Sequence, residues 1–121
     1  MTEKAVEGWV LIDGLADLAP SGGGERPVLD VLARTAGATV VRLGFRAGQA
    51  MREHRADRPI LLTGQQGELE IRIGDNVIRL CPGVAVHIDA GVTHALSAAA
   101  DAVVTLLILE RAQPGPGDQP G

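Results

Sequence analysis

Two stretches of the chain decide its fold: GQAMREHRADRPILLTGQQG at residues 48–67 and GVAVHIDAGVTHALSA at residues 83–98. In the first, five residues separate Gly48 from His54, and Gly67 closes the stretch. In the second, five residues separate Gly83 from Asp89, and His94 follows Gly91 after two more. The two stretches therefore share a spacing, and each contains a histidine that can carry chemistry.

The segments around these stretches have the pattern of short β-strands. ELEIRI at residues 68–73 alternates strictly, with Leu69, Ile71 and Ile73 on one face. The next two residues, Gly74 and Asp75, suit a two-residue hairpin loop of type II′. Further strands are expected at residues 38–45, 76–80, 84–88 and 103–110. Many short strands with glycine turns predict an all-β sandwich, jelly roll or small barrel.

Together the two stretches resemble the paired motifs of the cupin family. The resemblance covers residues 39–110 and implies a cupin-type double-stranded β-helix, which is a jelly-roll barrel, with a short N-terminal extension. We predict three parts: an extension and Gly-rich linker at residues 1–27, the barrel at 28–111, and a disordered tail at 112–121.

The resemblance also implies a ligand set, which this chain carries only in part. Cupins usually bind a metal through two histidines and an acid of the first motif and one histidine of the second. Position by position, His54 and His94 keep the first and last of these ligands. The second histidine falls on Ala56 and the acid falls on Ile60. The resemblance thus places a ligand pocket around His54, His94, Ala56 and Ile60.

A third metal ligand has two candidates outside the motif positions. His87 would join His54 and His94 if the side of its strand that carries Ala85 and Asp89 lined the barrel. The apolar Val84, Val86 and Ile88 favour the opposite orientation, with His87 on the surface or in an interface. If residues 54–60 formed one regular strand, Asp57 would point away from His54, and only a β-bulge would turn it inward.

Three functions remain open at this point. The first is a cupin that binds a small molecule in the barrel pocket without catalysis, and the missing ligands favour it. The second is a metal-dependent enzyme of dioxygenase or isomerase type, in which iron, nickel, manganese or zinc is held by His54 and His94, and Glu53 is a candidate base. The third is a homodimeric interaction module with a vestigial pocket.

Composition excludes several other partners. The formal charge is -4 and aromatic residues make up 2% of the chain, so we expect neither nucleic acid nor an anionic membrane as a partner. No apolar run is long enough to span a membrane, and the first residues lack the features of a signal peptide. Cys81 has no second cysteine to pair with, which fits a reducing, cytoplasmic location.

Four further expectations concern particular residues. Six glycines, including Gly64, are expected at positive φ where strands end or bend. Trp9 is expected to anchor the extension onto the barrel or a partner. The last strand is apolar on both faces, so a partner subunit would cover one of them, and we expect a homodimer. Arg52, Arg55 and Arg58 form either a solvated face paired with Glu53 and Asp57 or an attractant for a carboxylate ligand.

Overall fold

The computed structural model describes residues 8–18, 24 and 26–111, and this part of the chain contains strands and no helix. It therefore holds no helix that could cross a membrane. The strands are β1 (Val28–Arg34), β2 (Ala38–Phe45), β3 (Ala50–His54), β4 (Ile60–Gln66), β5 (Leu69–Ile73), β6 (Asn76–Leu80), β7 (Ala85–Ile88), β8 (His94–Ser97) and β9 (Ala102–Leu109).

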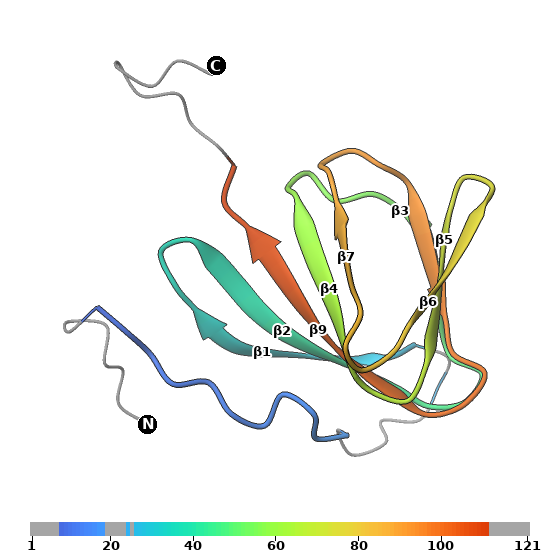
Figure 1. Ribbon diagram of the computed structural model, residues 1–121, viewed down its shortest axis with the longest axis horizontal. Coiled ribbons are helices and arrows are strands. Elements are labelled where there is room, and N and C mark those ends of the chain that lie inside the picture. Colours follow the sequence, from blue (N-terminus) through green and yellow to red (C-terminus); the bar gives the residue numbers. More distant parts are fainter. Residues whose placement is uncertain (1–7, 19–23, 25, 112–121) are drawn as a thin grey trace.

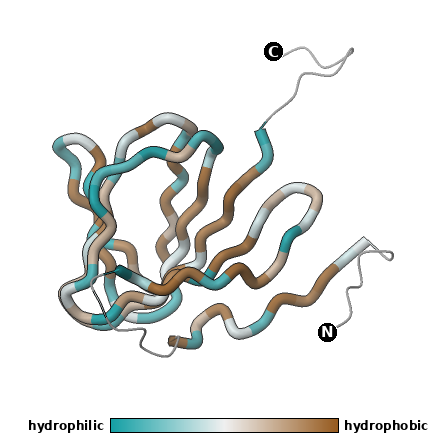
Figure 2. Tube along the Cα trace, turned by 180° about the vertical axis from the view of Figure 1, so that it is seen from behind, coloured by the Kyte–Doolittle hydropathy of each residue, from teal (hydrophilic) through white to brown (hydrophobic). Residues whose placement is uncertain are grey.

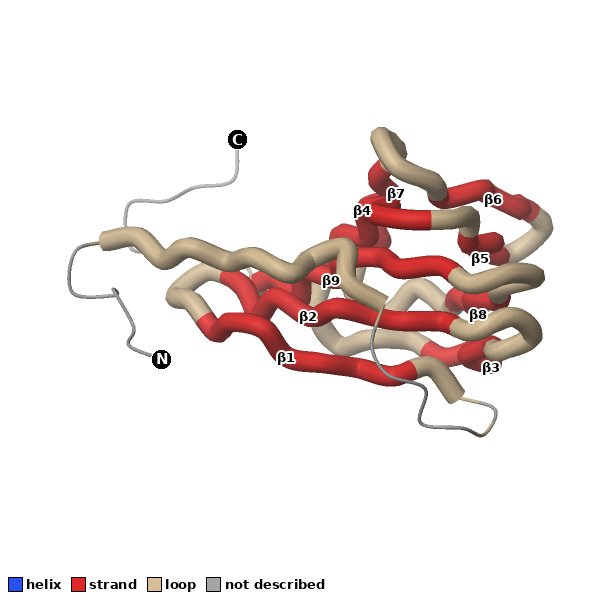
Figure 3. The backbone as a smooth tube through the Cα atoms, turned by 90° about the horizontal axis from the view of Figure 1, so that it is seen from below, coloured by secondary structure: helices blue, strands red, loops and turns tan. Residues whose placement is uncertain are grey.

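The strands form two antiparallel sheets that face each other (Figure 1). The five-stranded sheet has the order β1-β2-β9-β4-β7, and the four-stranded sheet has the order β3-β8-β5-β6. The fold is all-β, as the sequence predicts. Seen from below, β1, β2 and β9 of the five-stranded sheet lie to the left of the four-stranded sheet, and loops connect the two sheets (Figure 3).

The core lies between the sheets and is almost entirely aliphatic. The alternation of residues 68–73 is confirmed, because Leu69 and Ile71 are fully buried. Gly74 has φ 60° in the hairpin between β5 and β6, in agreement with the predicted turn. Phe45, also fully buried, is the single aromatic ring of the core cluster. Burial of these apolar side chains is the main stabilising term of such a domain.

The outer face of the five-stranded sheet is covered by the chain's own N-terminal segment. Val103 and Thr105 alternate with the core residues of β9, yet they are 1% and 4% exposed. Residues 8–18 run along this face (Figures 1 and 3). The carbonyl of Gly14 accepts a hydrogen bond from Arg42 at 2.7 Å, and that of Ala16 accepts one from Gln66 at 2.7 Å. On this face of β9, Val103 and Thr105 are buried, whereas Leu107 and Leu109 are half-buried, and the homodimer stays a prediction.

Trp9 is not an anchor within this chain, since 56% of its surface is exposed. Backbone carbonyls held by Arg42 and Gln66 fix the segment instead. The apolar stretches of this segment and of the sheet beside it are visible together in Figure 2. The tail predicted to be disordered, residues 112–121, lies outside the described residues.

Gly64 lies inside β4 and has no positive φ, so the expected reason for glycine there is wrong. The actual reason is a close backbone approach. A Cβ at this position would overlap the carbonyl group of Cys81, and the Gly64 amide donates to the Val84 carbonyl at 3.0 Å. Glycine is required here by space rather than by dihedral angle.

We predict that Gly64→Ala lowers the free energy of unfolding by about 1–3 kcal/mol, because the Cys81 backbone must shift to admit the methyl group. Urea denaturation followed by circular dichroism measures the change. Gly37→Ala is the matched control, since a Cβ there meets nothing within 4 Å. Equal stability of the Gly64 variant and the wild type would contradict the close approach.

Candidate functional site

His54 and His94 lie directly opposite each other on the neighbouring strands β3 and β8. Their ring centroids are 4.4 Å apart and the ring planes meet at 62°, an edge-to-face arrangement. His94 is 2% exposed, whereas His54 is partly exposed. The structure thus brings together the two histidines on which the family resemblance depends.

A β-bulge in β3 produces this pairing. Met51 lies opposite Leu96 and His54 lies opposite His94, so three steps along β3 match two steps along β8. In a regular strand, Glu53 would have taken the place opposite His94. The extra residue moves Glu53 to the exposed side and turns His54 toward His94. The bulge lies at residues 52–53 and does not reorient Asp57.

Both imidazole rings are held in the same way by the backbone. Nδ1 of His54 donates to the Arg52 carbonyl at 2.6 Å, and Nδ1 of His94 donates to the Val92 carbonyl at 3.0 Å. A carbonyl cannot donate, so each neutral ring carries its proton on Nδ1 and leaves the Nε2 lone pair unprotonated. In its neutral form, each ring therefore offers Nε2 as a hydrogen-bond acceptor.

The environment of His94 keeps its ring neutral. Burial lowers the pKa of His94 below its ordinary value of 6.5, because the charged ring would lose solvation. The hydrogen bond to the Val92 carbonyl raises this pKa, and the nearby His54 lowers it further. The net shift is downward, so His94 is an acceptor at neutral pH.

The remaining residues of the predicted pocket lie apart from the pair. Strand β3 ends at His54 and β4 begins at Ile60, so residues 54–60 do not form one strand. Pro59, which lacks an amide hydrogen, precedes β4. Ile60 is 5% exposed and belongs to the hydrophobic core, and Ala56 packs against that core. Neither of them borders a cavity with His54.

The two candidates for a third metal ligand also lie elsewhere. The side chain of His87 is 49% exposed and its Nδ1 lies 3.7 Å from a carboxylate oxygen of Asp89. Val86 and Ile88, on the other face of β7, contact the core, so His87 points outward. The Asp57 side chain is 90% exposed and lies near Arg111, with 4.0 Å between their closest charged atoms.

The donor set therefore does not fit a resident metal ion. Within the described ranges, no group of three or more His, Cys, Asp or Glu side chains could hold an ion together. Catalytic zinc normally has three protein ligands, and non-haem iron uses two histidines and a carboxylate. His54 and His94 supply two ligands, one fewer than either arrangement requires.

A groove of about 880 Å³ opens beside the histidine pair. It runs between β1 and β3, which are the free edges of the two sheets on that side of the molecule. Nine residues line it: Arg26, Pro27, Leu29, Gly48, Ala50, Met51, Arg52, Glu53 and His54. His54 is thus the member of the predicted pocket that reaches the groove. A second, shallower depression of about 500 Å³ involves Asp57, Pro59, Ala90, Gly91 and Arg111.

Sequence reasoning missed the β1 side of this groove. Arg26 and Pro27 fall within the predicted extension and linker, and the first strand expected from the sequence begins at residue 38, after β1. The signal was present, because Leu29 and Val31 alternate with Asp30 and share a face in VLDVLAR. Val28 and Leu32 are also apolar, and they obscure this alternation.

Comparison with known proteins supports the fold. No family model matches the chain, and no curated protein matches it. Among solved structures, an RmlC-like cupin protein from Desulfovibrio desulfuricans is 22% identical, with a TM-score of 0.71, and the match covers 84% of this chain and 97% of that protein.

Two further structures agree. A cupin superfamily protein from Desulfitobacterium hafniense is 19% identical, with a TM-score of 0.66, and the match covers 83% of this chain and 98% of that one. A protein with a double-stranded β-helix domain from Klebsiella pneumoniae is 23% identical, with a TM-score of 0.64, over 76% and 82% of the two chains. The chain is a small cupin-fold domain.

We predict that the stability of the protein falls as the pH is lowered through about 6.5, because the unfolded chain takes up a proton on His94 that the folded state resists. The unfolded state binds more protons in this window, so the free energy of unfolding decreases toward acid. His94→Asn should flatten this slope, since the Asn amide still donates to Val92 but cannot titrate.

Urea denaturation between pH 5 and pH 8 measures the slope for each variant. His87→Asn, at an exposed position, is the matched control and should leave the slope unchanged. The account of His94 is wrong if the two variants and the wild type all show the same pH dependence.

Proposed function

We propose that this cupin-fold domain binds a small organic molecule in the groove between β1 and β3, and that it acts by binding rather than by catalysis. The observation that carries the proposal is that His54 belongs both to the histidine pair and to the lining of the groove. Its ring packs against His94 on one side, and its side chain lines the groove on the other.

The size and the lining of the groove support a small-molecule ligand. A volume of about 880 Å³ lies within the range of about 300–1,000 Å³ typical of such sites. Apolar surface from Leu29 and Met51 lies beside the polar His54, a combination that binds an organic body and orients one polar group. The unprotonated Nε2 of His54 would accept a hydrogen bond from a hydroxyl or amide of the ligand.

The incomplete ligand set supports binding over metal-dependent chemistry. Two imidazoles whose Nδ1 atoms are fixed by backbone carbonyls are well placed to accept hydrogen bonds. No carboxylate joins them, and the nearest acid in sequence, Glu53, lies on the exposed side of the bulge. We therefore assign His54 and His94 a role in recognition.

A thermal-shift screen of small organic acids, alcohols and sugars tests this proposal. We expect at least one compound to raise the melting temperature of the wild type. His54→Asn should lower the affinity for that compound by about tenfold, because the Asn amide retains the hydrogen bond to the Arg52 carbonyl but lacks the Nε2 acceptor.

His87→Asn serves as the control and should leave affinity unchanged. Compounds that stabilise the His54 variant as much as the wild type would rule out His54 as the recognition group. A screen without a single stabilising compound would count against small-molecule binding itself.

A further inference from the structure

The arginines of this chain divide into two groups by their partners. Six of them lie within 4.0 Å of a carboxylate oxygen: Arg42, Arg46, Arg58, Arg72, Arg79 and Arg111. Arg58 pairs with Glu110 and Arg111 lies by Asp57, so the partners expected from the sequence for the arginines around His54 are wrong. Within the described part of the chain, the other four have no ion-pair or hydrogen-bond partner for their guanidinium groups: Arg26, Arg34, Arg52 and Arg55.

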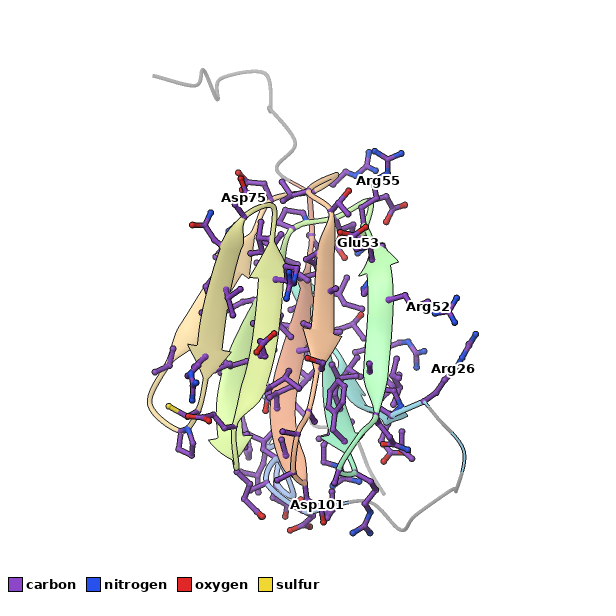
Figure 4. The ribbon with its side chains drawn as sticks, turned by 90° about the vertical axis from the view of Figure 1, so that its right-hand side faces the viewer. Arg26, Arg52, Glu53, Arg55, Asp75 and Asp101 are labelled. Carbon is purple, nitrogen blue, oxygen red and sulfur yellow. The ribbon has the colours of Figure 1, made fainter. Side chains whose placement is uncertain are left out.

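Arg26 and Arg52 both line the groove beside His54. Arg26 precedes β1 and Arg52 lies in β3, so the two guanidinium groups come from opposite walls. In Figure 4 both side chains project toward the same side of the molecule. Arg52 lies on the exposed side of β3, on the opposite face of the strand from Met51.

The groove also has an apolar part. Pro27, Leu29 and Met51 line the groove with them. Leu29 is 53% exposed because β1 lies at the edge of its sheet, beyond the cover of the four-stranded sheet. Because Leu29 shares the groove with Arg26 and Arg52, an amphipathic molecule could cover its exposed side chain and reach both charges.

The charge of the groove is positive. Glu53 is the one acid among the nine lining residues, against the two arginines. A guanidinium presents paired N–H groups in a plane, and a carboxylate accepts them in a bidentate geometry. Two such groups on opposite walls, with neither neutralised by a described acid, are suited to an anionic head group.

We propose that the groove selects small organic carboxylates with an apolar body. The carboxylate lies between Arg26 and Arg52, and the body covers Pro27, Leu29 and Met51 in the direction of His54. This inference rests on the proposed function, since it names the ligand class of the same groove. It adds a charge requirement that His54 alone does not impose.

Three probes test the charge requirement on the full chain. Two have matched shape, 4-phenylbutyrate and the neutral 4-phenylbutan-1-ol, and the third, acetate, has the charge alone. Isothermal titration calorimetry gives the affinity, and ¹H–¹⁵N chemical shifts locate the site. We expect phenylbutyrate to bind at least about tenfold more tightly than the alcohol. Acetate, which has the charge without the apolar body, should bind more weakly than phenylbutyrate.

Arginine variants then assign the head-group site. Arg26→Gln and Arg52→Gln should each lower the affinity for phenylbutyrate by about tenfold and leave the affinity for the alcohol unchanged. Arg55→Gln is the matched control: Arg55 also has no described partner and projects nearby in Figure 4, but it does not line the groove. It should leave both affinities unchanged.

Several outcomes would overturn the inference: equal affinity for the acid and the alcohol, no binding of phenylbutyrate, or equal losses in Arg55→Gln and Arg52→Gln. The last result would indicate a general effect of net charge. If the alcohol binds and shifts the His54 resonances while the acid has no advantage, the proposed function survives and the carboxylate preference fails. If no probe shifts His54 and the screen also finds no ligand, both fail.

Discussion

The extra residue that β3 carries between Met51 and His54 is the constraint on which the site depends. Strand pairing alternates side chains between two faces, so a single inserted residue exchanges what lies on each of them. Here it brings His54 opposite His94, and it leaves Arg52 and Glu53 toward the solvent. One local irregularity thus creates the histidine pair and moves Glu53 to the exposed side. Without it, a carboxylate would face a buried imidazole.

The site lies where the aliphatic core meets the open edge of the sandwich. His94 is buried with the core, His54 bridges to the groove, and Leu29 lies on the overhanging edge strand. The hydrogen bonds from Nδ1 to backbone carbonyls fix both rings without any further side chain. Much of the support for the pair therefore comes from the backbone of β3 and of the approach to β8. The proposed binding role relies on the orientation that these hydrogen bonds give to the two rings.

The all-β class and the β5–β6 hairpin could be predicted from the sequence, because each follows from a period or a turn. That His54 and His94 belong to one site was implied by the family resemblance. The bulge could not be predicted, since no residue type at positions 52–53 requires one. The loop between His54 and Ile60 was also not predicted, and it excludes one regular strand over residues 54–60. The N-terminal cover of β9 and the arginine pairs were also beyond prediction, because they join residues far apart in the chain. Local pattern indicates strands, whereas these contacts depend on the assembled sheets.

We propose that His54 and His94 serve recognition and do not hold a resident metal ion. Elemental analysis of untagged protein, purified without chelators and then incubated with iron, nickel, manganese and zinc salts, tests this claim most directly. The account predicts far less than one equivalent of any of these metals after desalting, because two imidazoles supply too few ligands. Close to one equivalent of a single metal, lost when His54 and His94 are both changed to alanine, would contradict it.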